Sequence, residues 1–301
     1  MSVASDASRV TGESLTSSMS RPRRLKDVLF KGLLLTSLAI ALGVLLTLLA
    51  DTFLEGRQRL NWDLVSNMPS ARPARAGIQS AIFGSLWVVG LTAAISLPLG
   101  IGAALYLEEF ARKDRWYNRL IELNIQNLAG VPSIVYGILG LAFVARGSLG
   151  WGFTVRTAAL ILSMVVLPTV VIATREAIRA VPSSLRQGGL ALGATQWQTV
   201  YRQVLPAAVP GIATGSILAT SRALGESAPL LMVGALTFVT FNPSGFDSPY
   251  TVLPLQIFRY ISEARAEFKP LAAASAIVLL VFLVLMNSLA ILLRNKFQKK
   301  W

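Results

Sequence analysis

The stretch PLAAASAIVLLVFLVLMNSLAILL, residues Pro270 to Leu293, contains no Asp, Glu, Lys or Arg. About 20 consecutive apolar residues in a helix are enough to cross the hydrocarbon core of a bilayer. Inside that core every backbone polar group needs an internal hydrogen-bond partner, which an α-helix provides. The stretch therefore predicts a transmembrane helix near the carboxyl end of the chain.

Five further stretches that also lack charged residues precede it. They are Gly32 to Ala50, Ala76 to Leu107, Leu123 to Ala145, Thr157 to Thr174 and Gln203 to Ser221. Ser227 to Phe246 is uncharged as well, so the fifth span is either one long tilted helix or a helix broken near Gly225 and Pro229. The sequence predicts an all-α, polytopic integral membrane protein with six transmembrane helices.

The composition agrees with a membrane protein and excludes several kinds of chemistry. Of the 301 residues 53% are hydrophobic and 14% charged, and the mean hydropathy is +0.59. The absence of Cys and His excludes disulfides, thiol or imidazole nucleophiles, and the usual protein ligands of zinc and haem. We therefore expect no cofactor and no metal, and a membrane-embedded enzyme is disfavoured.

Basic residues are distributed unevenly among the predicted loops. With six spans, the two tails and the second and fourth loops share one side of the membrane, and they carry 18 Lys and Arg against nine in the opposite loops. Cytoplasmic loops are the ones enriched in Lys and Arg. Both termini are therefore predicted to be cytoplasmic, and the net charge of +13 reflects topology rather than binding to nucleic acid.

The same pattern divides the chain into parts. We expect a disordered basic cytoplasmic tail at 1–30, an uncleaved first transmembrane anchor at 31–55, a core of five transmembrane helices at 76–294 and a basic cytoplasmic tail at 295–301. Glu108, Glu109 and Arg112 follow the second apolar stretch, and we expect them to form a solvated cytoplasmic helix end.

The fourth loop, residues 175–206, is long for a connection between helices, which usually takes about two to eight residues. Leu185, Leu192 and Trp197 could supply the apolar faces of two short helices, and Gly193 between them permits a sharp turn. The loop is predicted to be a helix-turn-helix that docks to a cytoplasmic partner. Trp197 would then enter a groove of that partner or, alternatively, anchor a helix among lipid headgroups.

The run from Gln187 to Pro206 resembles the EAA loop of ABC-importer permeases. Gly193 and Leu205-Pro206 match that pattern at its spacing, whereas Gln187-Gly188-Gly189 stands where Glu-Ala-Ala is usual. The resemblance implies the type I importer permease (MetI-like) architecture and a loop that contacts an ATPase. The residues expected to make this coupling contact are Gln187, Gly193, Ala194, Trp197, Leu205 and Pro206.

Other stretches resemble the phosphate-specific permeases within that family, namely residues 104–110, 127–137, 222–231 and 253–258. The run Ala228-Pro229-Leu230-Leu231 is similar to the PstA type rather than the PstC type. The resemblance implies a multi-pass protein of the bacterial inner membrane. Its partners would be membrane lipid, a PstC-type permease, two PstB-type ATPase subunits and a periplasmic PstS-type phosphate-binding protein. The chain has no Gly-x-x-x-x-Gly-Lys-Ser/Thr loop, so we expect ATP to be hydrolysed by another chain.

Arg222 and Glu226 are the charged pair expected within a span, and Ser227 follows them. On a continuous helix residues four apart share a face, so the two charges would neutralise one another. One interpretation places Arg222, Glu226 and Ser227 on the path of an anion, because a guanidinium binds phosphate oxygens in pairs. The other interpretation makes the two charges a structural ion pair. Alternatives for the function are import of another oxyanion (phosphonate, sulfate or molybdate) and secondary transport without ATP.

Overall fold

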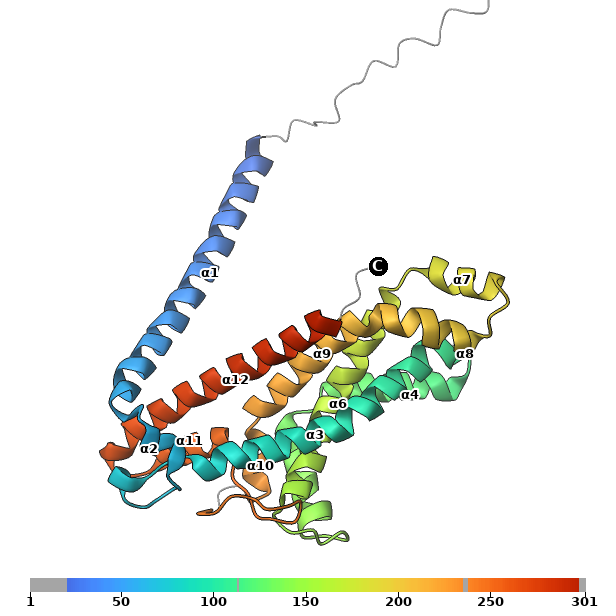
Figure 1. Cartoon of the computed structure of the whole chain (residues 1–301). Helices are drawn as coiled ribbons and strands as arrows, with labels where there is room; N and C mark the ends of the chain where they lie inside the picture. Colours follow the sequence, from blue (N-terminus) through green and yellow to red (C-terminus); the bar gives the residue numbers. More distant parts are fainter. Residues whose placement is uncertain (1–20, 113, 235–237, 298–301) are drawn as a thin grey trace, which may run out of the picture. The chain divides into compact units, whose positions relative to one another are not determined.

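The computed structural model describes residues 21–112, 114–234 and 238–297, and this part of the chain is helical without any named strand (Figure 1). The helices, in chain order, are α1 Arg21–Gly56, α2 Trp62–Ser66, α3 Gln79–Leu105, α4 Trp116–Ala129, α5 Ser133–Leu139, α6 Val155–Arg179, α7 Ser183–Ala191, α8 Gln196–Thr199, α9 Leu205–Gly225, α10 Ala228–Met232, α11 Leu253–Ser262 and α12 Lys269–Phe297. Wider π-helical turns at Tyr106–Phe110, Gly140–Ala145 and Val200–Val204 continue α3, α5 and α8.

The helices that are long and apolar enough to cross a membrane agree with the predicted spans. Five stretches in the described chain pass this test individually, and α4 with the helix after it makes a sixth if the pair is counted as one span. That pair is bent by 102°. The all-α, polytopic architecture predicted from the sequence is confirmed, with a third span that is bent rather than straight.

The bend follows from the residues between α4 and α5. Gly130 ends α4, and its N–H donates to the Asn127 carbonyl at 3.0 Å. Pro132 has no N–H to donate and its ring disfavours helical geometry at Val131, so the chain leaves the helix and starts a new one at Ser133. Proline alone does not determine a break, since Pro98 and Pro168 lie inside α3 and α6.

The fifth span begins earlier than predicted and is broken where one of the two alternatives placed the break. α8, the π-helical turn and α9 are continuous from Gln196, so the second short helix of the fourth loop is the first turn of the span. α9 ends at Gly225, and α10 begins at Ala228 with Pro229 in its first turn. The interpretation as a broken helix is confirmed.

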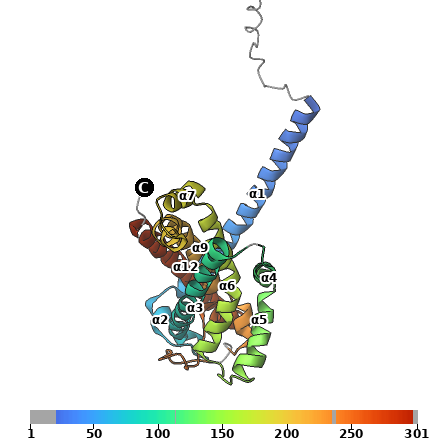
Figure 2. The same ribbon diagram turned by 90° about the vertical axis from the view of Figure 1, so that its right-hand side faces the viewer.

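The core of the unit that begins at Thr52 lies where α3, α6 and α9 pack side by side (Figures 1 and 2). Small residues allow α6 and α9 to approach closely, because Gly211 faces Ala177 and Gly215 faces Ala173. One group of fully or almost fully buried apolar side chains joins α3, α5, α6, α10 and α11, and its members include Val88, Tyr136, Ile161, Leu162, Leu230 and Leu255.

The two ends of the chain differ from the predicted boundaries. α1 belongs mostly to a separate unit that ends at Asp51, and it begins at Arg21 rather than near residue 31. Residues 1–20 of the predicted disordered tail lie outside the described residues. At the other end α12 continues to Phe297, and the rest of the predicted tail, 298–301, also lies outside them.

Candidate functional site

The fourth loop contains the helix-turn-helix that its sequence predicts. α7 begins after Pro182, and Gly193 adopts φ +81°, a left-handed conformation that favours glycine over any residue with a side chain. Beyond the turn, the Thr195 hydroxyl accepts from the Gln198 N–H while the Gln198 side chain accepts from the Thr195 N–H. This capping box starts α8 at a defined residue and so fixes the direction in which the chain leaves the turn.

The turn carries apolar side chains that the described chain leaves largely exposed. Leu192 is 90% exposed and Trp197 61% exposed, and Leu190 is exposed as well. Trp197 stacks on Tyr201 with 6.3 Å between ring centroids and also touches the ring of Phe110 at 5.9 Å. Exposed apolar groups clustered on a turn are typical of a surface that binds another protein. We call Leu190, Leu192 and Trp197 the coupling surface.

The predicted coupling residues are not all on this surface. Gln187, Gly193 and Pro206 are exposed, while Ala194 and Leu205 are half-buried. Gln187 lies on α7, and Leu205 and Pro206 open α9, which continues directly from α8. Around the turn, therefore, the structure brings Gly193, Ala194 and Trp197 together, whereas Leu205 and Pro206 lie farther along the fifth span.

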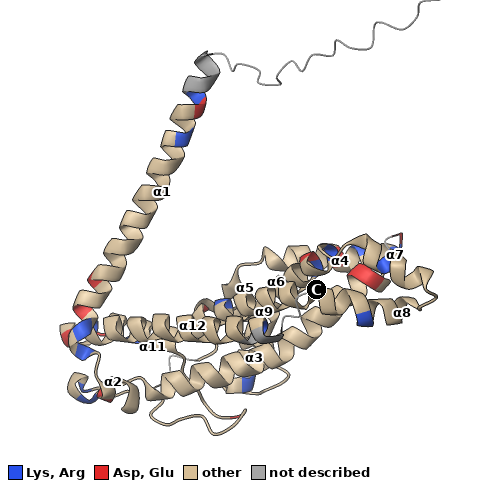
Figure 3. Ribbon diagram, turned by 45° about the horizontal axis from the view of Figure 1, so that its top comes forward, with Lys and Arg blue, Asp and Glu red and all other residues tan. Residues whose placement is uncertain are grey.

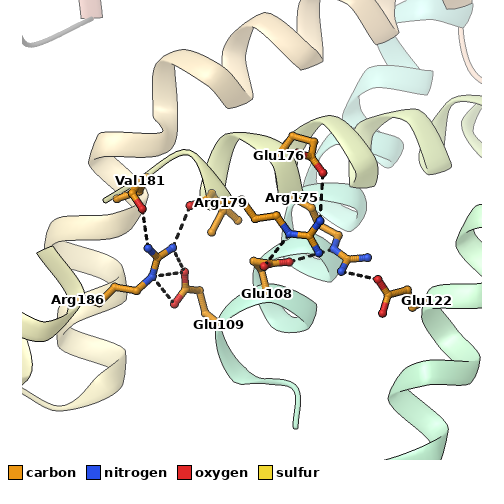
Figure 4. Close-up of polar contacts among 9 residues, drawn as sticks. Glu108, Glu109, Glu122, Arg175, Glu176, Arg179, Val181 and Arg186 are labelled. Atoms are coloured by element: carbon orange, nitrogen blue, oxygen red, sulfur yellow. Dashed lines mark hydrogen bonds and ion pairs between the residues drawn. The ribbon is translucent and has the colours of Figure 1, made fainter. Parts of the chain in front are cut away.

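A cluster of charged side chains joins α3 to α6 and α7 at this end of the molecule. Figure 3 shows acidic and basic segments together near α4, α7 and α8, and Figure 4 shows their contacts. Glu108 accepts from Arg175 Nε at 3.2 Å and from Arg179 Nε at 2.9 Å, while Glu122 accepts from Arg175 Nη2 at 2.8 Å. Arg179 also pairs with Glu176 at 3.2 Å.

Glu109 makes a separate set of contacts with α7. Arg186 Nη2 donates to Glu109 Oε1 at 2.6 Å, and Arg186 Nε donates to the same carboxylate at 3.0 and 3.3 Å. The guanidinium also donates to the carbonyls of Val181 at 2.8 Å and Ile178 at 2.9 Å. Arg186 thus uses its planar fork on one carboxylate and its remaining N–H groups on the chain that leads into α7.

The expectation that Glu108 and Glu109 form a solvated helix end is therefore wrong. Their side chains are only 9% and 7% exposed, and each is paired with arginine. The π-helical turn at Tyr106–Phe110 directs the two neighbouring carboxylates to different elements. Charge balance could have revealed this, because the fourth loop has Arg175, Arg179 and Arg186 but only Glu176 to neutralise them.

The residues predicted for an anion path lie at the break in the fifth span. Arg222 is exposed in the last turn of α9, and Glu226 and Ser227 lie half-buried beyond the end of that helix. Glu226 has extended backbone angles, φ −78° and ψ 118°. The predicted ion pair between Arg222 and Glu226 is absent from the described part of the chain, because the helix that would have placed both on one face ends at Gly225.

Glu226 has a different partner, which the sequence did not indicate. Ser133 Oγ at the start of α5 donates to Glu226 Oε1 at 2.8 Å. The helices that follow the two breaks, α5 and α10, also pack closely, because a Cβ on Gly137 would lie 2.6 Å from the Pro229 carbonyl oxygen. Discontinuous helices commonly form the substrate site of a membrane transporter.

Within the described residues no group of three or more Asp or Glu side chains could hold a metal ion. Among the described residues beside the helix breaks, the guanidinium of Arg222 has no ion pair, the carboxylate of Glu226 is hydrogen-bonded, and Ser133 and Ser227 supply two hydroxyls. Such groups can bind and release an anion through charge and hydrogen bonds.

Comparisons with known proteins match most of the chain. The family model described as "Binding-protein-dependent transport system inner membrane component" matches residues 96–300. A probable ABC transporter permease of Bacillus subtilis, YqgI, is 35% identical over 237 residues, which cover 79% of this chain and 80% of that protein. The phosphate transport system permease protein PstA of Haemophilus influenzae is 31% identical over 270 residues, covering 88% of this chain and 92% of that protein.

One solved structure agrees with the fold. A chain of a bacterial alginate ABC transporter, crystallised in complex with an alginate pentasaccharide-bound periplasmic protein, has a TM-score of 0.64 at 20% identity. The match covers 91% of this chain and 96% of that chain. At this identity the likeness concerns the fold, and it agrees with the predicted permease architecture.

Proposed function

The chain belongs to the family of binding-protein-dependent transport system inner membrane components, and we propose that it is the PstA-type permease of a phosphate importer. A permease subunit of an ABC transporter provides the path across the membrane. Phosphate as the substrate is supported by the relative from Haemophilus influenzae, whose name states phosphate transport and which matches nearly the whole chain. Import of another oxyanion has no comparable support, and secondary transport is not favoured by membership in this family.

The partners follow from what the chain lacks and what it exposes. It has no phosphate-binding loop of the ATPase type, so the energy of ATP must come from other chains. The coupling surface offers exposed apolar groups next to Gln187, which suits docking of a PstB-type ATPase subunit. A PstC-type permease would complete the path, and a periplasmic PstS-type protein would deliver phosphate.

The orientation supported by the charges places the coupling surface in the cytoplasm. The two predicted tails and the second and fourth loops hold twice as many Lys and Arg as the opposite loops. In a bacterium this corresponds to a multi-pass protein of the inner membrane with both termini cytoplasmic. The break between α9 and α10 then lies toward the periplasmic half, where an anion would arrive.

The single observation that carries the assignment of the site is that Arg222 is not neutralised by Glu226. An arginine keeps its charge at any physiological pH, and its fork matches two phosphate oxygens. Because Ser133 holds Glu226, the guanidinium stays available to an anion. ATP-driven closure of the motor subunits would rock the permeases about this site and expose it alternately to the two sides.

The test is ATP-dependent phosphate uptake by the assembled complex in vesicles. Arg222→Gln should lower uptake by about tenfold or more while the complex still assembles, because one guanidinium contact with an anion is lost. The matched control is Arg72→Gln, which removes an exposed charge from the loop between the first and second spans and should leave uptake unchanged. Normal uptake by Arg222→Gln would make Arg222 structural, and transport of sulfate or molybdate in place of phosphate would refute the proposed substrate.

A further inference from the structure

The position of α7 is fixed by polar contacts rather than by burial. α7 has no buried residue, so hydrophobic packing contributes little to holding it against the rest of the molecule. Arg186, a half-buried residue of this helix, donates to the Glu109 carboxylate and to the carbonyls of Ile178 and Val181. Loss of this one side chain would remove the charged contacts between α7 and its surroundings.

Contacts between the helix-turn-helix and the end of α3 meet at two consecutive residues, Glu109 and Phe110. The Glu109 side chain binds Arg186 of α7, and the Glu109 backbone carbonyl accepts a hydrogen bond from the Gln196 side chain of α8. The ring of Phe110 touches Trp197 on the coupling surface. Both arms of the helix-turn-helix are therefore attached to the end of α3 rather than only to the helices that flank the loop.

The neighbouring glutamate has a different role. Glu108 binds Arg175 and Arg179, which belong to the last turns of α6, and α3 packs along α6 over much of its length. Glu108 thus joins two long helices that are already in contact. Of the two glutamates, only Glu109 joins a long helix to α7.

We propose that the Glu109–Arg186 ion pair ties the coupling loop to α3, so that displacement of the loop by an ATPase moves the α3–α6 pair as one body. The use of this tie in transport rests on the proposed function, whereas its existence does not. An ion pair shielded on the Glu109 side, with further hydrogen bonds to the chain, resists separation far better than an exposed pair would. Glu109 and Arg186 are positioning residues, because neither needs to touch phosphate or ATP.

A distance measurement on the full chain in lipid nanodiscs tests the tie without any partner. The chain has no Cys, so Tyr106→Cys at the end of α3 and Leu190→Cys on α7 can carry spin labels at two exposed positions. The distance distribution should be narrow in this background, clearly broader with Arg186→Gln, and largely restored with Arg186→Lys, which keeps the charge. Arg202→Gln is the matched control, since this exposed arginine of the same loop has no ion pair among the described residues, and it should leave the distribution narrow.

Transport by the assembled complex provides the second measurement. Arg186→Gln and Glu109→Gln should each lower the phosphate imported per ATP hydrolysed by about tenfold, with ATP hydrolysis itself retained, because neither substitution changes a residue of the coupling surface. A narrow label distribution in Arg186→Gln, or an unchanged ratio of phosphate to ATP in both variants, would overturn the tie. A wild-type complex that does not import phosphate would refute the proposed function, and the label distances would still decide whether the tie exists.

Discussion

Ser133 at the start of α5 donates a 2.8 Å hydrogen bond to Glu226 at the end of α9, and this contact joins the two helix breaks. It also keeps the Glu226 carboxylate engaged away from Arg222, four residues earlier. We expect Ser133→Ala to release the carboxylate toward the guanidinium and so weaken anion binding. The KM for phosphate uptake should rise by about threefold to tenfold, while Ser133→Thr, which retains a hydroxyl, should behave as wild type. An unchanged KM in Ser133→Ala would show that the hydrogen bond does not influence Arg222.

The close approach of α5 and α10 leaves no room for a side chain at Gly137. A Cβ there would lie 2.6 Å from the Pro229 carbonyl oxygen and 2.7 Å from its Cα, and backbone atoms cannot swing aside. Gly137→Ala should therefore lower the stability of the protein by about 1–3 kcal/mol, measured as a lower Tm in detergent. Gly102→Ala is the control, because no atom lies within 4 Å of its Cβ and alanine favours the helix, so its Tm should be equal or higher. Equal Tm values for the two variants would contradict the close approach.

The turn in the coupling loop requires a left-handed backbone conformation at Gly193, where φ is +81°. The space around it is open, so the cost of a substitution comes from the backbone alone, about 1–2 kcal/mol for most residues and less for asparagine. Phosphate uptake should therefore be highest in Gly193→Asn, lower in Gly193→Ala and lowest in Gly193→Val. Gly188→Ala, in α7 with equally open surroundings, should keep normal uptake. If uptake instead decreases with the size of the side chain, so that Gly193→Ala transports better than Gly193→Asn, the loss comes from a steric contact with the ATPase.

Two glutamates share Arg175 as a partner but differ in burial. The Glu108 side chain is 9% exposed and also binds Arg179, whereas the Glu122 side chain is 40% exposed. Glu108→Gln should lower the stability by about 2 kcal/mol or more, because it leaves a buried arginine with less neutralisation. Glu122→Gln should cost less than about 1 kcal/mol, as exposed ion pairs do. Thermal unfolding of both variants checks this, and an equal loss would mean that burial of Glu108 does not strengthen its contacts.

The sequence predicted the helical architecture because transmembrane spans depend on one local property, the absence of charge over about 20 residues. The same property says nothing of direction, so it does not predict the 102° bend after α4. Pro132 alone does not decide it either, because Pro98 and Pro168 lie inside helices that continue. The turn at Gly193 was predicted because it needs only a glycine between two short amphipathic segments.

The contacts of the candidate site were harder to predict. The spacing of Arg222 and Glu226 indicates an ion pair only if the helix continues, and it ends at Gly225. Ser133 is far from Glu226 in sequence, and a single hydroxyl gives no pattern that marks it as a partner. Glu108 and Glu109 were expected in solvent because two adjacent charges at a helix end are usually hydrated, and only the fold brings three arginines to them.

The π-helical turn at Tyr106–Phe110 closes with a 2.8 Å hydrogen bond from the Ala111 N–H to the Tyr106 carbonyl, so it holds one residue more than an α-helical turn. Removal of one residue there would rotate everything beyond it by about 100° around the helix axis, since each α-helical residue advances by that angle. The span would keep its hydropathy and almost its whole length. Its two glutamates would nevertheless face other neighbours. The angular phase of this short turn therefore decides which side chains the two glutamates meet, as much as the identity of the residues does.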